Sequence, residues 1–252
     1  MNIKDIFVII FVVAAYASAK SCNLPPSLWC SSRQVAIKCD VEEQCHPYFS
    51  LLSRSNVELV NFTLYMESLC PDCQNFVNNQ LWPAFKAVGE IMNLVIVPYG
   101  NAIEKKNDSK WKFMCQHGEE ECYGNLIETC AIHYNQNASV FMPFIHCIES
   151  SSLLPRNNAP KCAKKFGLDY SLIISCVKGR LGNELEHKMA KKTNALEPPH
   201  TYVPWVTLNG VHTDAIQTAA QENLVKLICD TYQGSPKPDA CLPSKSKTLS
   251  RA

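Results

Sequence analysis

The run VELVNFTLYM (residues 57–66) and the CPDC motif that follows it (residues 70–73) decide the fold. The run is rich in β-branched and aromatic residues and partly alternates, which predicts a core strand. After the motif, apolar residues recur at roughly helical spacing, which predicts a helix that starts near Cys73 and is kinked by Pro83. NLVIVPY (residues 93–99) predicts a second strand. The order of strand, Cys-x-x-Cys, helix and strand predicts one βαβ unit with the cysteine pair at the strand-to-helix turn.

The sequence that follows predicts an insertion and then a return to the sheet. A block rich in cysteine shows helix-like stretches without strand alternation, which predicts a mostly helical insertion at about residues 103–195. YVPWVTL (residues 202–208) predicts a third strand, and Asn209-Gly210 behind it is a strong hairpin signal. A helix is expected from about Asp214 to Tyr232, with its apolar residues on one face.

Composition is consistent with one large domain. The chain has 252 residues, of which 46% are hydrophobic and 19% charged, so it can bury a core. Its net charge of +1 argues against nucleic-acid binding driven by bulk charge. We expect the main domain at residues 55–232 and a disordered tail at 235–252, whose start Cys241 could tether.

The first 19 residues have the features of a secretory signal peptide. An apolar run of ten residues, Ile6 to Ala15, is followed by the small-residue pattern Ala17-Ser18-Ala19. The run is too short to span a bilayer, which takes about 20 apolar residues. We expect residues 1–19 to be cleaved before Lys20, with an N-terminal anchor as the alternative. The chain is therefore predicted to enter the secretory pathway.

The predicted compartment bears on the 14 cysteines, because disulfides form and persist in the secretory pathway. Four of them fall in residues 20–50, which predicts a small stapled unit. A metal site there is an alternative, but the spacings lack the tight pair of zinc modules. Apart from the CPDC pair, the cysteines expected to form structural disulfides are Cys22, Cys30, Cys39, Cys45, Cys115, Cys122, Cys130, Cys147, Cys162, Cys176, Cys229 and Cys241.

Three N-glycosylation sequons fit the same route. They begin at Asn61, Asn107 and Asn137. Asn107 lies in a polar stretch, whereas Asn61 lies inside the first predicted strand and would need to face solvent.

The CPDC motif carries the chemistry that the residues suggest. A cysteine at a helix N-terminus is stabilised as thiolate by the unsatisfied N–H groups there, and the thiolate is the nucleophile of thiol–disulfide exchange. We expect Cys70 to attack a substrate disulfide and Cys73 to resolve the mixed disulfide. A structural half-zinc site, or pairing of each cysteine elsewhere, is the alternative.

Val203-Pro204 is the second part of this candidate site. A proline that opens a strand after a β-branched residue fits the cis-proline that faces the cysteine pair in thioredoxin-like folds. We expect Val203 and Pro204 to shape a substrate groove.

CQHGEEEC (residues 115–122) is the other distinctive segment. His117 between cysteines could bind a metal, but structural disulfides are favoured in an oxidising compartment, and no metal site is predicted. The acidic triplet is expected to be a solvated face. His200 lies either near the active site or in a surface loop.

These segments resemble the gamma-interferon-inducible lysosomal thiol reductases, known as GILT. The resemblance covers about residues 57–232. It rests on the strand with the Cys-x-x-Cys pair, on LVIVPYGNA (residues 94–102) and on LEPPHTYVPWVTLNG (residues 196–210). It rests also on the family signature Cys-Gln-His-Gly-x-x-Glu-Cys-x-x-Asn-x-x-x-x-Cys, met by Cys115, Gln116, His117, Gly118, Glu121, Cys122, Asn125 and Cys130. Residues 20–50 are similar to a saposin A-type segment, although they are too short for a full saposin bundle.

The resemblance implies an α/β, thioredoxin-like fold with a helical, disulfide-braced insertion, preceded by the small cysteine-rich segment. It implies reduction of protein disulfides at acidic pH in endosomes and lysosomes, which aids unfolding for proteolysis and serves antigen processing or innate immunity. The catalytic pair carries over to Cys70 and Cys73, and Asp72 between them would oppose thiolate formation. No bound cofactor, nucleic acid or membrane insertion is expected; the partners are disulfide-bonded proteins and a small thiol such as cysteine. A secreted disulfide oxidase or isomerase, or a non-enzymatic secreted immune or host–pathogen binding factor, is the alternative.

Overall fold

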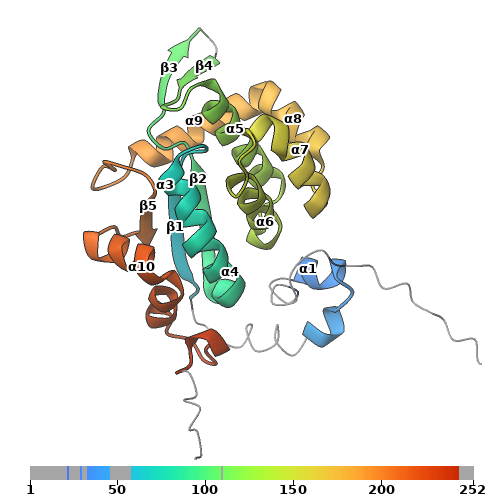
Figure 1. Ribbon diagram of the computed structural model, residues 1–252, viewed down its shortest axis with the longest axis vertical. Coiled ribbons are helices and arrows are strands. Elements are labelled where there is room, and N and C mark those ends of the chain that lie inside the picture. The colour runs from blue at the N-terminus through green and yellow to red at the C-terminus, as the bar shows by residue number, and fades with distance from the viewer. Residues whose placement is uncertain (1–21, 23–28, 30–32, 46–57, 109, 244–252) are drawn as a thin grey trace, which may run out of the picture.

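Figure 1 shows the protein as a computed structural model, which describes residues 22, 29, 33–45, 58–108 and 110–243. The predicted signal peptide and the last residues of the tail lie outside the described residues, as does much of the segment at 20–50. Among the described residues, no helix combines the length and the apolar character needed to cross a membrane.

A three-stranded sheet forms the centre of the domain. Its strands are β1 (Val60–Met66), β2 (Met92–Pro98) and β5 (Trp205–Leu208), in the order β2-β1-β5. β1 runs parallel to β2 and antiparallel to β5, so Phe62 on β1 lies between residues of both neighbours. A βαβ unit flanked by an antiparallel third strand and a C-terminal helix is the thioredoxin-like arrangement, and the predicted fold class is confirmed.

The helical rod after the cysteine pair comprises α3 (Pro71–Phe76), the π-helical turn η2 (Val77–Leu81), α4 (Trp82–Val88) and a short 3-10 turn, η3 (Gly89–Ile91). The first helix begins at Pro71, slightly earlier than the spacing predicted. The irregularity expected at Pro83 takes the form of the π-helical turn just before it. A proline has no N–H to continue the regular ladder, so the bonding pattern changes on its N-terminal side.

The C-terminal part confirms the predicted hairpin signal and helix. Asn209 and Gly210 have positive φ angles of 50° and 80° and turn the chain back to a bridge at Val211. The helix is α10 (Asp214–Thr231), which packs on β5 and α4. The prediction of a disordered tail from residue 235 is wrong for its first part, because a turn at η4 (Asp239–Cys241) is fixed to α10 by a disulfide.

The insertion is helical, as predicted, except at its start. Residues 103–114 form a hairpin of β3 (Ile103–Asn107) and β4 (Lys110–Met114), which projects from one end of the molecule (Figure 1). The prediction that this stretch lacks strands is wrong: β4 alternates between exposed lysines and the half-buried Trp111 and Phe113, but over only five residues, and β3 shows no such pattern. The helices that follow are α5 (Glu119–Tyr134), α6 (Ala138–Glu149), α7 (Pro155–Phe166), α8 (Tyr170–Lys178) and α9 (Arg180–Asn194).

Disulfides brace the insertion and both ends of the described chain, as predicted. One joins α5 to α8, another joins α6 to α7, and a third closes the loop before α5. The pairs are Cys130–Cys176, Cys147–Cys162, Cys115–Cys122, Cys229–Cys241 and Cys22–Cys39, the last next to the short helix α1 (Arg33–Lys38). Cys45 is also disulfide-bonded, and Cys30 lies outside the described residues.

The main core lies between the sheet and the helices on its two sides. Phe62 and Leu64 of β1 are fully buried within it, together with Phe85 of α4 and Phe144 of α6. Helices α5 and α9 of the insertion pack on β2. The insertion is therefore part of the domain that holds the cysteine pair.

Candidate active site

Cys70 and Cys73 are the free thiols among the described residues, and they sit at the start of α3. Cys70 is the N-cap, and its Sγ accepts a hydrogen bond from the backbone N–H of Cys73 at 3.3 Å. Pro71 fills the first helical position, where a missing N–H costs nothing. The turn predicted from the sequence thus places one sulfur where helix N–H groups converge.

The surroundings of Cys70 favour its thiolate. Its pKa is lowered to about 6, chiefly because the Cys73 thiol hydrogen-bonds to its sulfur, and the backbone N–H groups of Cys73 and Asp72 add to this. Burial opposes the shift, and so does the charge of the Asp72 carboxylate, as the sequence predicted. Cys70 thus has the lowered pKa that an attacking thiolate needs.

Cys73 has the opposite character. Its side chain is fully buried, whereas Cys70 keeps 6% of its surface exposed. The hydrogen bond that it donates to Cys70 raises the pKa of the Cys73 thiol, and burial raises it further. The two sulfurs therefore differ as an attacking and a resolving thiol must differ.

Val203 and Pro204 line a groove beside this helix, as predicted. The peptide bond between them is cis. The cavity has a volume of about 290 Å³ and is also lined by Asp72 and Phe76 of α3. Gln217 of α10 fixes the backbone of Pro204, because its side-chain amide donates a hydrogen bond to the Pro204 carbonyl at 3.0 Å.

A buried carboxylate, Glu67, lies three residues before Cys70 and was missed by the sequence analysis. Its Oε2 accepts a hydrogen bond from the backbone N–H of Asn101 at 2.7 Å. Its Oε1 lies 3.5 Å from Nδ1 of His117 and has no hydrogen-bond partner among the described residues. Burial raises the pKa of Glu67 to about 7. The only signal in the sequence was a charged residue at the end of an apolar strand.

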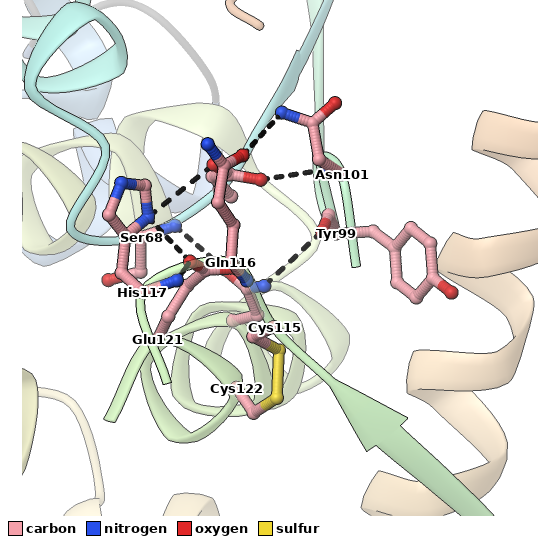
Figure 2. The surroundings of a disulfide bond; sticks show 10 residues. Ser68, Tyr99, Asn101, Cys115, Gln116, His117, Glu121 and Cys122 are labelled. Carbon is pink, nitrogen blue, oxygen red and sulfur yellow. Dashed lines mark hydrogen bonds and ion pairs between the residues drawn. A yellow bond between two sulfur atoms is a disulfide. The ribbon is translucent and has the colours of Figure 1, made fainter. Parts of the chain in front are cut away.

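The CQHGEEEC segment reaches the same place (Figure 2). Glu121 accepts a hydrogen bond from the backbone N–H of His117 at 2.6 Å, and the same oxygen lies 2.6 Å from Nδ1 of the His117 ring. The disulfide between Cys115 and Cys122 closes this loop. The prediction that the acidic triplet is solvated is wrong for Glu121, which is fully buried because it caps the loop.

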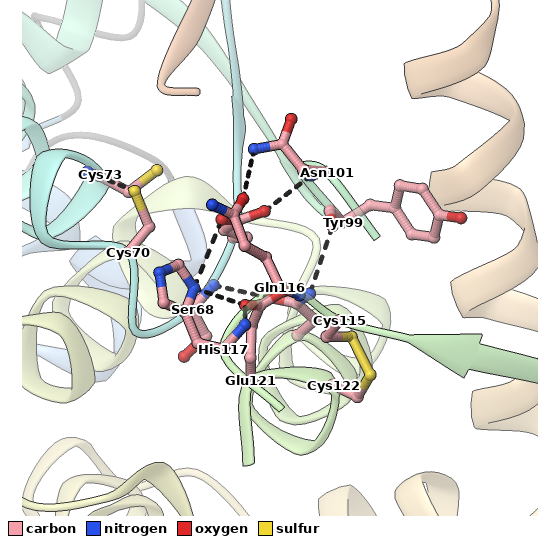
Figure 3. A network of polar contacts seen from close by, with 12 residues as sticks. Ser68, Cys70, Cys73, Tyr99, Asn101, Cys115, Gln116, His117, Glu121 and Cys122 are labelled. Carbon is pink, nitrogen blue, oxygen red and sulfur yellow. Dashed lines mark hydrogen bonds and ion pairs between the residues drawn. A yellow bond between two sulfur atoms is a disulfide. The ribbon is translucent and has the colours of Figure 1, made fainter. Parts of the chain in front are cut away.

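Ser68 links the cysteine pair to the insertion. Its backbone N–H donates to Oδ1 of Asn125 on α5 at 2.7 Å, and its hydroxyl donates to Glu149 on α6 at 3.2 Å. Gly124 lies so close that a Cβ there would come within 2.3 Å of the Ser68 hydroxyl. Figure 3 shows Ser68 and the His117 network beside the cysteine pair.

Further carboxyl groups lie buried deeper in the insertion. Burial raises the pKa of Glu149 to about 7 and of Glu186 to about 8, and it raises the pKa of Glu128 well above its usual range. None of the three forms an ion pair with a basic side chain within the described part of the chain.

The side chains of metal-ligand type that come together here are those of Glu67, His117 and Glu121, with candidate atoms within 4.8 Å of one another. Nδ1 of His117 and both oxygens of Glu121 already take part in hydrogen bonds. We therefore interpret the group as a hydrogen-bonded network rather than a metal centre.

The other candidate residues are His200 and the three asparagines of the sequons. His200 is half-buried against the backbone of Gly100, and burial lowers its pKa. Asn61 is exposed on β1 and Asn107 is exposed at the end of β3, while Asn137 is the half-buried N-cap of α6. Ser109, the last residue of the second sequon, lies outside the described residues.

Comparison with known proteins identifies similar chains. The family model described as "Gamma interferon inducible lysosomal thiol reductase (GILT)" matches residues 61–166. A protein of Carassius auratus named gamma-interferon-inducible lysosomal thiol reductase is 42% identical over 93% of this chain and 92% of its own length. The protein of that name from Mus musculus is 38% identical over 72% of this chain and 71% of its own. A gamma-interferon-responsive lysosomal thiol protein of Arabidopsis thaliana is 38% identical over 76% and 79%.

Solved structures with a similar course of the chain include DsbA of Chlamydia trachomatis, with a TM-score of 0.46 and 13% identity over 67% of this chain and 88% of that one.

Proposed function

Because the chain belongs to the gamma interferon inducible lysosomal thiol reductase family, we propose that Cys70 and Cys73 carry out its thiol reductase chemistry on the disulfide bonds of proteins. The observation that carries the proposal is the pair of free thiols at the start of α3, with the pKa of one lowered and that of the other raised.

The reaction takes two exchanges. The Cys70 thiolate attacks one sulfur of a substrate disulfide, forms a mixed disulfide and releases the other sulfur as a thiolate that takes up a proton. Cys73 then loses its proton and attacks Sγ of Cys70, which releases the second substrate thiol. The substrate gains two electrons and two protons, and the enzyme is left with a Cys70–Cys73 disulfide.

We propose that this chemistry operates at the acidic pH of endosomes and lysosomes. An unperturbed thiol is thiolate at only about one part in several thousand near pH 5. With a pKa of about 6, Cys70 is thiolate at about one part in ten there. Substrate unfolding for proteolysis, with a role in antigen processing or innate immunity, would follow from this location.

A small thiol such as cysteine is the proposed reductant that restores the dithiol. The groove beside α3 would receive the polypeptide that flanks the substrate disulfide. Its lining of Asn75, Asn79, Gln80 and Gln221, together with Tyr202, provides amide groups suited to an extended backbone.

Disulfide reduction with insulin as substrate, at about pH 5, tests the proposal. The wild-type protein is expected to turn over, Cys70→Ser to be inactive, and Cys73→Ser to accumulate the mixed disulfide. Equal turnover by all three would refute the assignment. A strongly oxidising potential of the pair would instead favour the oxidase or isomerase, and full biological effect of Cys70→Ser would favour a binding factor.

A further inference from the structure

The second exchange poses a problem that the cysteine pair cannot solve alone. The Cys73 thiol must give up its proton before its sulfur can attack, yet its side chain is fully buried. Bulk water and buffer cannot reach that proton directly. A group inside the protein must therefore carry it away.

Two buried carboxyl groups are close enough to the cysteine pair to interact with it electrostatically, Glu67 and Glu149. Glu149 is reached through the Ser68 hydroxyl, and the acidic groups that interact with it are buried: Glu128 next to it and, beyond that, Glu186. Glu67 differs in two ways. Its backbone N–H contacts the Cys73 sulfur, and its unpartnered Oε1 faces a ring that reaches solvent.

That ring belongs to His117. Its Nδ1 lies 3.5 Å from Oε1 of Glu67, and 32% of its side chain is exposed. The contact with Glu121 fixes the orientation of the ring, and the backbone N–H of Asn101 hydrogen-bonds to Oε2 of Glu67. In the view of Figure 3, the ring lies on the side of the network that faces the cysteines.

We propose that Glu67 receives the proton of Cys73 in the second exchange and that His117 passes it to solvent. The inference rests on the proposed function of the cysteine pair. In this step the S–H bond of Cys73 breaks, its proton moves to the Glu67 carboxylate, and the sulfur forms a bond to Sγ of Cys70. The released substrate thiolate takes a proton from solvent, and Glu67 returns its own to Nδ1 of His117 while Nε2 of the same ring releases a proton to solvent. The signature Cys-Gln-His-Gly thus has a role in proton transfer.

The charges around Glu67 suit a group that exchanges protons. Glu121 from α5 and Cys70 from α3 disfavour its ionised form, while His117 and the Asn101 N–H favour it. The resulting pKa of about 7 leaves an ionised fraction of about one in a hundred at pH 5, rising tenfold per pH unit.

The test separates the two exchanges. Wild type and Glu67→Gln, each fully reduced, are mixed with a disulfide substrate and quenched with acid at intervals, and the mixed disulfide is quantified by mass spectrometry. The variant is expected to form it within about threefold of the wild-type rate but to resolve it at least tenfold more slowly, since proton transfer by a positioned group contributes about 10²-fold or more. Glu67→Asp should restore part of the resolution rate, and His117→Gln should slow resolution without altering attack.

The pH dependence of the resolution rate distinguishes proton transfer by Glu67 from a purely structural role of this residue. Resolution by the wild type should level off above about pH 7, where Glu67 is ionised, whereas resolution by Glu67→Gln should keep rising. Glu119→Gln, an exposed neighbour in the first turn of α5, is the matched control and should behave as wild type. Equal resolution rates and pH profiles for wild type and Glu67→Gln would overturn the inference alone. A wild type that neither forms the mixed disulfide nor reduces the substrate would overturn the proposed function and this inference with it.

Discussion

Replacing Glu186 with Gln should make the stability of the protein less dependent on pH. Glu186 lies on α9 with 2% of its surface exposed, and it accepts a hydrogen bond from the Thr129 hydroxyl at 3.0 Å. Burial raises its pKa from 4.5 to about 8; the charge of Glu104 adds to the increase and the Thr129 hydrogen bond reduces it.

The sign and size of the effect follow from these values. The unfolded chain ionises this carboxyl above about pH 4.5, whereas the folded chain keeps it protonated until about pH 8, so stability is lost as the pH rises through that window. At pH 7 the loss amounts to about 3 kcal/mol, because one pKa unit corresponds to about 1.4 kcal/mol. Glutamine does not titrate, and its side-chain oxygen can still accept the hydrogen bond from Thr129, so the variant should not lose this stability.

Urea or thermal unfolding of wild type and Glu186→Gln, with disulfides intact, checks the prediction at about pH 4.5 and pH 7. The two proteins should agree within about 1 kcal/mol in acid, and the variant should be more stable by about 3 kcal/mol, or 6–12 °C in Tm, at neutral pH. Glu184→Gln on the same helix is the control, because its carboxylate forms only a solvent-exposed pair with Arg180, which contributes little to stability. If Glu186→Gln loses as much stability between the two pH values as the wild type does, the carboxyl is not held neutral in the fold and the reasoning fails.

Three further substitutions probe the segment around the cysteine pair. Asn125→Ala should destabilise the fold by about 1–3 kcal/mol in urea unfolding, because the buried Ser68 N–H loses its acceptor. Gly124→Ala should cost a similar amount by the same measurement and slow insulin reduction, because its Cβ would displace Ser68; unchanged activity would mean that α5 does not position this loop. Asp72→Asn should lower the pKa of Cys70 and raise its alkylation rate at pH 5 about two- to threefold, and a slower rate would contradict the inferred repulsion.

The sheet and the cysteine pair were predictable because their signals are local. The strand at Val60–Met66 carries alternating β-branched and aromatic residues, and the CPDC motif stands directly between it and a helical pattern. The end of the third strand was predictable because the turn behind it requires positive φ angles, which Asn209-Gly210 adopts more readily than most dipeptides. Such patterns depend on neighbours in the sequence and need no tertiary information.

The buried carboxyl groups around the cysteines were not predictable in this way. Glu67, Glu121 and Glu149 are each typical surface residues by type, and their burial results from contacts between segments far apart in the chain. The β3–β4 hairpin was missed because the alternation in β4 spans only five residues and β3 is polar apart from Ile103. A single sequence shows which residues are acidic but not which of them tertiary packing removes from water.

The disulfides that brace the insertion have a consequence if a small thiol is the reductant, as proposed. A thiolate must approach a disulfide along the axis of its sulfur–sulfur bond, and the half-cystines of Cys130–Cys176 are 0% and 2% exposed. Neither an external thiol nor a second molecule of the same enzyme can therefore reduce this disulfide until the helices separate. The loop closed by Cys115 and Cys122 is less shielded, since both residues are half-buried. Reduction of the enzyme's own disulfides should therefore begin at Cys115–Cys122 and leave Cys130–Cys176 intact.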